Sequence, residues 1–178
     1  VQYVIRPHQD RHHDFRGYAG QVAGGIFKPG DEVMVLPSGL TSTIASIETK
    51  DGPIDEAFAP MSVVIRLADE IDISRGDMIC RVHNQPQVTQ DVDAMVAWMT
   101  DRPLVAGQKL VVKHTTRSCR AVVRALQYRI DVNTLHRDEA ATSLELNQIG
   151  RVRLRTTQPL LADEYRRNRA TGGFVLID

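Results

Sequence analysis

The sequence predicts an all-β protein built from two β-barrels in tandem. Short segments rich in β-branched residues recur along all 178 residues, and turn-forming Gly, Pro, Asp and Asn residues separate them. Few stretches have the 3.6-residue period of an amphipathic helix. A polar, proline-containing segment at residues 83–87 divides the chain near its middle. We therefore expect one barrel over residues 1–84 and a second over residues 85–178.

Residues 15–37 carry the clearest barrel signature in the first half. Two short apolar stretches, residues 20–23 and 26–27, come before a turn at residues 28–31 that contains Pro and Gly. Proline fixes φ at a value that turns use, and glycine adopts backbone angles that other residues avoid. Residues 32–36 then alternate with the strand period of two. The other strands expected here span residues 1–6, 41–48, 61–67 and 77–82, and residues 71–76 are expected to form a short helical or 3₁₀ turn.

The second half predicts a further set of strands, at residues 91–99, 109–114, 119–132, 143–146, 150–156 and 174–177. Residues 119–132 are ambiguous, because their apolar residues fit either a helical stripe or one face of a strand. Their β-branched content favours a strand. The side chains expected on its apolar face are Val122, Leu126, Tyr128 and Ile130. We expect Pro159 to interrupt the chain and residues 161–169 to hold one short helical turn.

The composition is that of an ordinary soluble globular protein, with 42% hydrophobic and 25% charged residues. No run approaches the roughly 20 apolar residues that a membrane span needs. We expect no signal peptide, because the N-terminus soon becomes polar. The chain begins with Val1, so we expect it to be a piece of a longer protein. Cys80 and Cys119 are the only cysteines and are expected to be reduced thiols, which predicts a cytoplasmic location.

The charges give no global sign of nucleic-acid binding, because 22 Lys and Arg balance 22 Asp and Glu. The two expected barrels nevertheless differ, with net charges of −4 and +4, which favours packing against each other or against different partners. Two groups of arginines could hold RNA phosphates or an acidic protein, or could simply be solvated. One group lies on a strand face (Arg151, Arg153, Arg155) and the other in a loop (Arg166, Arg167, Arg169).

The sequence contains no recognisable catalytic motif. The phosphate-binding pattern GxxxxGK followed by Ser or Thr is absent, as is the guanine-reading pattern NKxD, so we expect no GTP binding by this chain alone. The His8, His12 and His13 loop offers imidazoles near two aspartates, but its spacing fits no closed zinc site. We therefore expect no catalytic, cofactor-binding or metal-binding residue in the chain.

Several motifs carry a family resemblance. Residues 16–20, 25–33 and 74–77 resemble domain 2 of the translation elongation GTPases. Longer motifs resemble the GTPase subunit of bacterial ATP sulfurylase, that is, sulfate adenylyltransferase subunit 1. They lie at residues 14–17, 35–39, 69–77, 131–135 and 168–178, so the resemblance covers nearly the whole chain. The histidine-rich loop at residues 7–13 departs from it by being longer than the family usually has.

This resemblance implies a barrel of the elongation-factor domain 2 type over residues 1–84 and one of the domain 3 type over residues 85–178. It implies that GTP, Mg²⁺ and ATP are bound by the full-length protein and its complex, and that this chain alone is inactive. In that family, GTP hydrolysis drives the formation of adenosine 5′-phosphosulfate and pyrophosphate from ATP and sulfate. The implied partners are the catalytic subunit, the protein's own N-terminal GTPase domain and, in fused forms, a C-terminal adenylylsulfate kinase domain.

A tRNA- or RNA-binding module, like the barrels of translation GTPases, is the alternative function. The zero net charge and the sulfurylase-type motifs argue against it. We expect neither a membrane nor a nucleic acid as a partner.

Overall fold

The computed structural model describes residues 1–6 and 15–178. It is 55% strand and 2% helix, which confirms the all-β prediction. Within the described residues, no helix is long and apolar enough to cross a membrane. The chain divides into two compact units, residues 1–88, 114–117 and 161–173 in the first, and residues 89–113, 118–160 and 174–178 in the second. The boundary between residues 84 and 85 stays a prediction.

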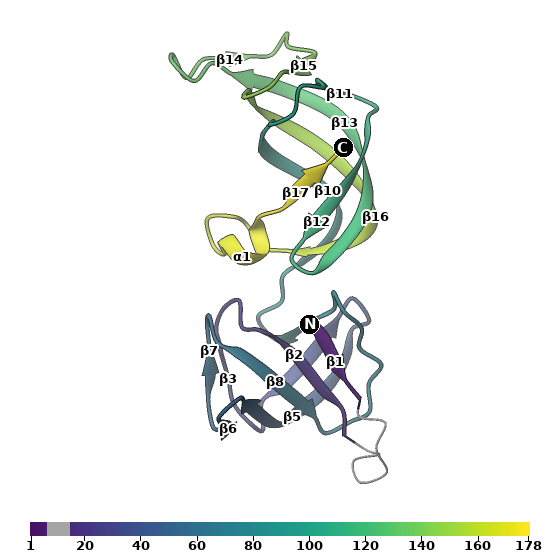
Figure 1. The fold of residues 1–178 in the computed structure, drawn as a ribbon, viewed down its shortest axis with the longest axis vertical. Coiled ribbons are helices and arrows are strands. Elements are labelled where there is room, and N and C mark those ends of the chain that lie inside the picture. Colours follow the sequence, from purple (N-terminus) through teal and green to yellow (C-terminus); the bar gives the residue numbers. More distant parts are fainter. Residues whose placement is uncertain (7–14) are drawn as a thin grey trace. The chain divides into compact units, whose positions relative to one another are not determined.

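The first unit is a wrapped antiparallel sheet (Figure 1). Its strand order is β1 (Tyr3–Ile5), β2 (Gly17–Gln21), β8 (Ser62–Leu67), β5 (Leu40–Thr49), β4 (Glu32–Leu36) and β9 (Met78–Arg81). β6 (Gly52–Ile54) pairs with β5, and β3 (Ile26–Phe27) pairs with β7 (Ala57–Phe58). The strand expected at residues 32–36 is therefore confirmed with its bounds unchanged.

Alternate side chains along the strands form the core of the first unit. Val33 and Val35 are buried on β4, whereas Met34 between them is only partly buried. On β5, Ile44 and Ile47 are both buried although they are three residues apart, because the register with β8 shifts between Ile44 and Ser46. The extra residue at such a bulge shifts the alternation of the strand, so that Ile47 rather than Ser46 faces the core. Burial of each of these side chains contributes about 1.5–3 kcal/mol.

The prediction of a helical turn at residues 71–76 is wrong. Ile71 and Ile73 are both buried in one cluster with Tyr18, and an extended chain places alternate residues on one side, as a helix does not. The Tyr18 hydroxyl donates a hydrogen bond to the Ile71 carbonyl oxygen over 2.8 Å. Only Arg75 and Gly76 form a turn, in which Gly76 has a φ of +95° that other residues rarely adopt.

The second sheet runs in the order β10 (Gln87–Ala97), β16 (Ile149–Ala162), β13 (Arg117–Ile130), β12 (Lys109–His114) and β17 (Val175–Ile177) (Figure 1). β14 (Arg137–Asp138) pairs with β13, and β11 (Leu104–Val105) pairs with β15 (Ser143–Leu144). The main strands fall where the sequence predicts them. The two-residue strands β11 and β14 lie in segments expected to be loops.

Residues 119–132 are a strand, as expected, but their predicted apolar face is wrong. The side chains buried on β13 are Cys119, Ala121 and Val123, so Val122 points to the opposite face. A register shift between Val123 and Ala125 changes the alternation, and Leu126 packs against the same core as Val123. A pattern of every second residue cannot anticipate a bulge within the strand.

The predicted break at Pro159 is also wrong. β16 continues through Pro159 to Ala162, because the φ of proline suits an extended strand as well as a turn. Leu161 stays in this strand and is buried with Leu36 and Cys80. The turn expected within residues 161–169 is present, because the N–H groups of Arg167 and Asn168 both donate to the Glu164 carbonyl oxygen over 2.8 and 3.0 Å. The short helix α1 (Arg169–Gly172) follows it.

Candidate functional site

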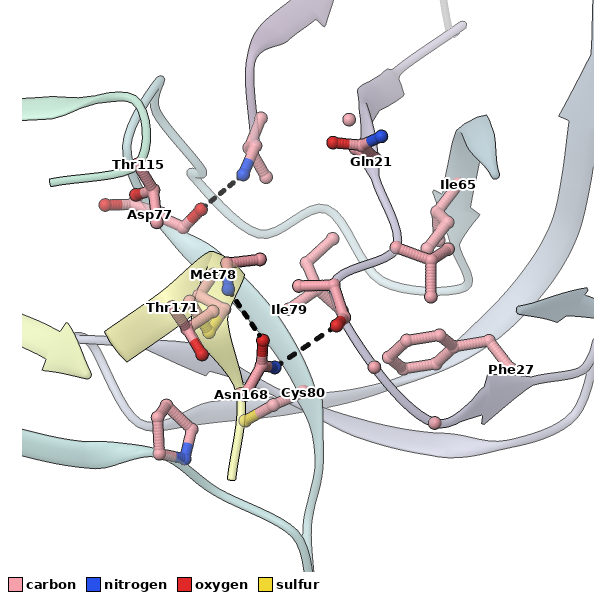
Figure 2. Close-up of a pocket in the computed structure, with 18 of the residues that line it drawn as sticks. Gln21, Phe27, Ile65, Asp77, Met78, Ile79, Cys80, Thr115, Asn168 and Thr171 are labelled. Carbon is pink, nitrogen blue, oxygen red and sulfur yellow. Dashed lines mark hydrogen bonds between the residues drawn. The ribbon is translucent and has the colours of Figure 1, made fainter. Parts of the chain in front are cut away.

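Asn168 organises the segment between β16 and β17. Its side-chain oxygen accepts a hydrogen bond from the Ala170 backbone N–H over 3.0 Å and so caps α1, a role for which Asn is among the preferred residues. Its side-chain nitrogen donates to the carbonyl oxygen of Ala23 over 3.1 Å. Figure 2 shows both bonds meeting at this one amide. Asn168 therefore starts the helical turn and ties it to the loop between β2 and β3.

Gly172 allows the same segment to fold closely on itself. A Cβ atom at this position would lie 2.5 Å from the Cα of Tyr165 and 2.9 Å from the carbonyl oxygen of Asp163. The neighbouring Thr171 hydroxyl donates to the Asp163 carboxylate over 2.7 Å. The Gly172 N–H donates to the Asn168 carbonyl oxygen over 2.8 Å. We refer to residues 163–173 as the capped loop.

The capped loop forms one wall of a cavity of about 530 Å³ in the first unit. Figure 2 shows Thr171 and Asn168 on this wall, with Ile79 and Cys80 of β9 and Phe27 of β3 also lining the space. Among the described residues, no buried side-chain nitrogen or oxygen lacks a hydrogen-bond partner. The cavity is therefore lined by both polar and apolar side chains, and those of its polar atoms that are buried are already hydrogen-bonded.

Cys80 in the cavity wall is held as a neutral thiol. Burial, with a smaller contribution from the Asp163 carboxylate, raises the pKa of the Cys80 thiol to about 11. The thiol donates a weak hydrogen bond to the Met34 carbonyl oxygen at 3.6 Å. Both Cys80 and Cys119 are buried and free, as the sequence predicts. A buried, protonated thiol is a poor nucleophile, so Cys80 is a packing residue.

The Cys80 thiol gives the stability of the protein a pH dependence. Its pKa in the folded protein lies above its ordinary value of 9.0, so the unfolded chain loses this proton first as the pH rises. The stability conferred by Cys80 is fully present below about pH 9 and is lost as the pH rises towards about 11. We expect the wild-type free energy of unfolding to fall relative to Cys80→Ala across this window, measured by urea denaturation. An unchanged difference would contradict this prediction.

A second polar contact holds the turn between β12 and β13 within the first unit. Arg117 and Asp77 form a 2.9 Å ion pair whose side chains are only 14% and 16% exposed. The second Asp77 carboxylate oxygen accepts from the Ser74 backbone N–H over 2.8 Å. Nε2 of the buried His114 lies 2.7 Å from the Thr171 carbonyl oxygen. The turn is therefore connected both to the start of β9 and to the capped loop.

The arginines on β16 are neutralised by the neighbouring strand β10. Arg151 lies 2.7 Å and Arg153 3.9 Å from carboxylate oxygens of Asp93, and Arg155 pairs with Asp91. The hydrogen bond from Arg151 lowers the pKa of Asp93. The structure therefore shows an ion-paired strand face for this group, which is none of the alternatives that the sequence left open.

The arginines in the capped loop differ, because all three are exposed. Arg167 donates to the side-chain oxygen of Asn84 over 2.8 Å, and Arg169 lies 5.9 Å from the centre of the Tyr165 ring. Within residues 1–6 and 15–178, no carboxylate lies within ion-pair distance of Arg166, Arg167 or Arg169. This loop is a local positive surface.

The residues that the structure describes contain no cluster of candidate metal ligands. No group of three or more His, Cys, Asp or Glu side chains there could hold a metal ion. The His8, His12 and His13 loop lies outside the described residues. The expectation that the chain holds no catalytic, cofactor or metal site stays a prediction.

Comparisons with known proteins agree on the fold and on one group of relatives. Residues 91–178 match the family model described as GTP-eEF1A C-terminal domain-like. Crystal structures of Sup35 with GDP and with GMPPNP have TM-scores of 0.84 and 0.82, at 18% identity over 92% of this chain and 41% of theirs. This likeness shows the fold alone and confirms the predicted barrels of the elongation-factor type.

The sequence relatives match the chain from end to end. The bifunctional enzyme CysN/CysC of Mycobacterium tuberculosis is 60% identical over 100% of this chain and 29% of the enzyme. The corresponding enzyme of Rhodopirellula baltica is 49% identical over 100% of the chain and 27% of its own length. Sulfate adenylyltransferase subunit 1 of Bacteroides thetaiotaomicron is 44% identical, over 100% of the chain and 38% of that subunit. The chain thus spans about a third of the length of these curated relatives.

Proposed function

Because the chain belongs to the family of sulfate adenylyltransferase subunit 1 and the bifunctional CysN/CysC enzymes, we propose that it is the barrel region through which that subunit docks its GTPase domain and the catalytic subunit. In this role the chain supports the formation of adenosine 5′-phosphosulfate in sulfate assimilation without carrying out a chemical step. The observation that carries the proposal is the 60% identity over the entire chain.

The geometry of the candidate site is consistent with a structural role for the chain rather than a catalytic one. Asn168 and the Asp77–Arg117 pair lock backbone segments together, and the one thiol in the cavity is held protonated. Sulfate activation is thermodynamically strongly unfavourable. A GTPase can therefore assist it only if its GTP-bound and GDP-bound states interact differently with the partner. Barrels with fixed internal contacts can transmit a change of nucleotide state as a rigid-body movement.

We assign GTP, Mg²⁺ and ATP to the full-length protein and its complex, since the chain has no phosphate-binding motif. In a CysN/CysC type of polypeptide, an adenylylsulfate kinase domain would be a further neighbour. A cytoplasmic location is part of the proposal and is supported by the two free cysteines.

The proposal predicts direct binding between the 178-residue chain and the catalytic subunit of sulfate adenylyltransferase from the same organism. We expect isothermal titration to give a saturable complex, because the chain is 60% identical over its whole length to part of a bifunctional CysN/CysC enzyme. A parallel filter-binding titration with tRNA tests the alternative, an RNA-binding module, which the unpaired Arg166, Arg167 and Arg169 would favour. Affinity for tRNA that falls steeply with salt, without binding to the catalytic subunit, would replace the proposal with that alternative.

A further inference from the structure

We propose that residues 165–169, the exposed part of the capped loop, form the surface that contacts an acidic face of the catalytic subunit. We call these residues the basic loop. The inference rests on the proposed function and adds to it a location on the chain and the chemistry of the partner. It is argued from the charge, the rigidity and the side-chain types of this segment.

The first argument is charge. Arg166, Arg167 and Arg169 are all exposed. In the described part of the chain, Arg167 bonds an amide and Arg169 lies over an aromatic ring, and neither of these partners carries a negative charge. The β16 arginines face carboxylates that their own sheet supplies. The basic loop therefore presents positive charge that no carboxylate of residues 1–6 and 15–178 pairs with, and complementary charge on a partner would steer and orient an encounter.

The second argument is rigidity. The N–H groups of Arg167 and Asn168 both donate to the Glu164 carbonyl oxygen, over 2.8 and 3.0 Å. Asn168 also fixes the loop to Ala23, and Gly172 packs against the backbone of Tyr165. A surface that is already ordered loses little conformational entropy when a partner binds. Such order is unnecessary for a loop that is only solvated.

The third argument is the type of side chain. Tyr165 is 58% exposed, and the Arg169 guanidinium lies over its ring at 5.9 Å. Tyr and Arg are the residue types that most often dominate the energy of protein–protein interfaces. The ring and the guanidinium attract each other at this distance, and both side chains are exposed to a partner.

A protein partner fits these features better than a nucleic acid. Nucleic-acid surfaces follow the phosphate backbone with many cations, whereas the arginines of β16, the other large group, are paired with Asp91 and Asp93. We therefore assign the basic loop to an acidic protein surface.

The test is a double charge reversal, Arg166→Glu with Arg169→Glu. Arg167 is left in place because it bonds Asn84. The matched control reverses Arg120 and Arg124, which are exposed on β13. Binding to the catalytic subunit is measured by isothermal titration at low and at high salt, and circular dichroism checks that both variants fold. We expect the basic-loop variant to bind about tenfold more weakly or worse, with a smaller salt dependence, and the control to bind within about twofold of wild type.

The outcomes separate the two proposals. If the wild-type chain does not bind the catalytic subunit, the proposed function fails and the basic loop loses its partner with it. If the wild type binds and the basic-loop variant binds equally well, this inference alone is overturned. If the variant keeps the catalytic subunit but loses affinity for tRNA, the loop is a nucleic-acid surface and the inference is again overturned.

Discussion

Replacement of Gly172 by alanine is expected to destabilise the first unit by about 3 kcal/mol, because the added methyl group has no space. Its Cβ would lie 2.5 Å from the Cα and 2.6 Å from the backbone nitrogen of Tyr165. Backbone atoms cannot move aside by changing rotamer, so the capped loop itself must shift. Urea denaturation followed by circular dichroism measures the change in the free energy of unfolding.

Two other glycines serve as controls for Gly172. A Cβ on Gly173 would lie 3.2 Å from the Arg169 carbonyl oxygen, and a Cβ on Gly20 would lie no closer than 3.7 Å to any atom outside its immediate neighbours. We expect Gly173→Ala to have an intermediate effect and Gly20→Ala to change stability by about 0.5 kcal/mol or less. Equal effects at Gly172 and Gly20 would show that the loop is not packed as described.

Replacement of Asp77 by alanine is expected to cost about 3 kcal/mol as well, because it leaves a nearly buried Arg117 without its carboxylate. The pair spans 2.9 Å, and its side chains are 14% and 16% exposed. The substitution also removes the acceptor for the Ser74 N–H. The same urea denaturation measures the loss, and Asp77→Asn should lose less because an amide oxygen can still accept that bond.

Asp72 provides the matched control for Asp77. It pairs with Arg6 over 3.1 Å, but the two side chains are 88% and 45% exposed. Exposed ion pairs contribute about 1 kcal/mol or less. Asp72→Ala should therefore leave the unfolding free energy almost unchanged. A loss as large as that of Asp77→Ala would mean that burial does not decide the strength of these pairs.

The sequence alone was enough to predict most of the fold. Strands such as residues 32–36 and 109–114 can be predicted because alternating apolar residues and adjacent turn residues agree there. Three features could not be predicted in this way. The bulge near Val123 changes the face of β13, the strand continues through Pro159, and the burial of Ile71 replaces a turn with extended chain. Each depends on tertiary contacts rather than on local pattern.

The candidate site was harder to predict for the same reason. Asn168 and Gly172 belong to a motif that the sequence marks only by family resemblance, because Asn168 bonds Ala23, which lies 145 residues earlier. The two arginine groups look alike in sequence. Only the pairing of strands β10 and β16 shows that one group forms ion pairs with Asp91 and Asp93, whereas the other group pairs with no carboxylate of the described residues.

We propose that this chain docks the sulfate adenylyltransferase machinery without chemistry of its own. The most direct measurement adds the purified chain, in increasing amounts, to sulfate adenylyltransferase reconstituted from the full-length GTPase subunit and the catalytic subunit, and follows GTP-dependent formation of adenosine 5′-phosphosulfate. The account predicts that the chain hydrolyses no GTP alone and inhibits the reaction saturably, by competing for the docking surfaces. GTP hydrolysis by the chain, or an undiminished reaction at a large excess of it, would contradict the account.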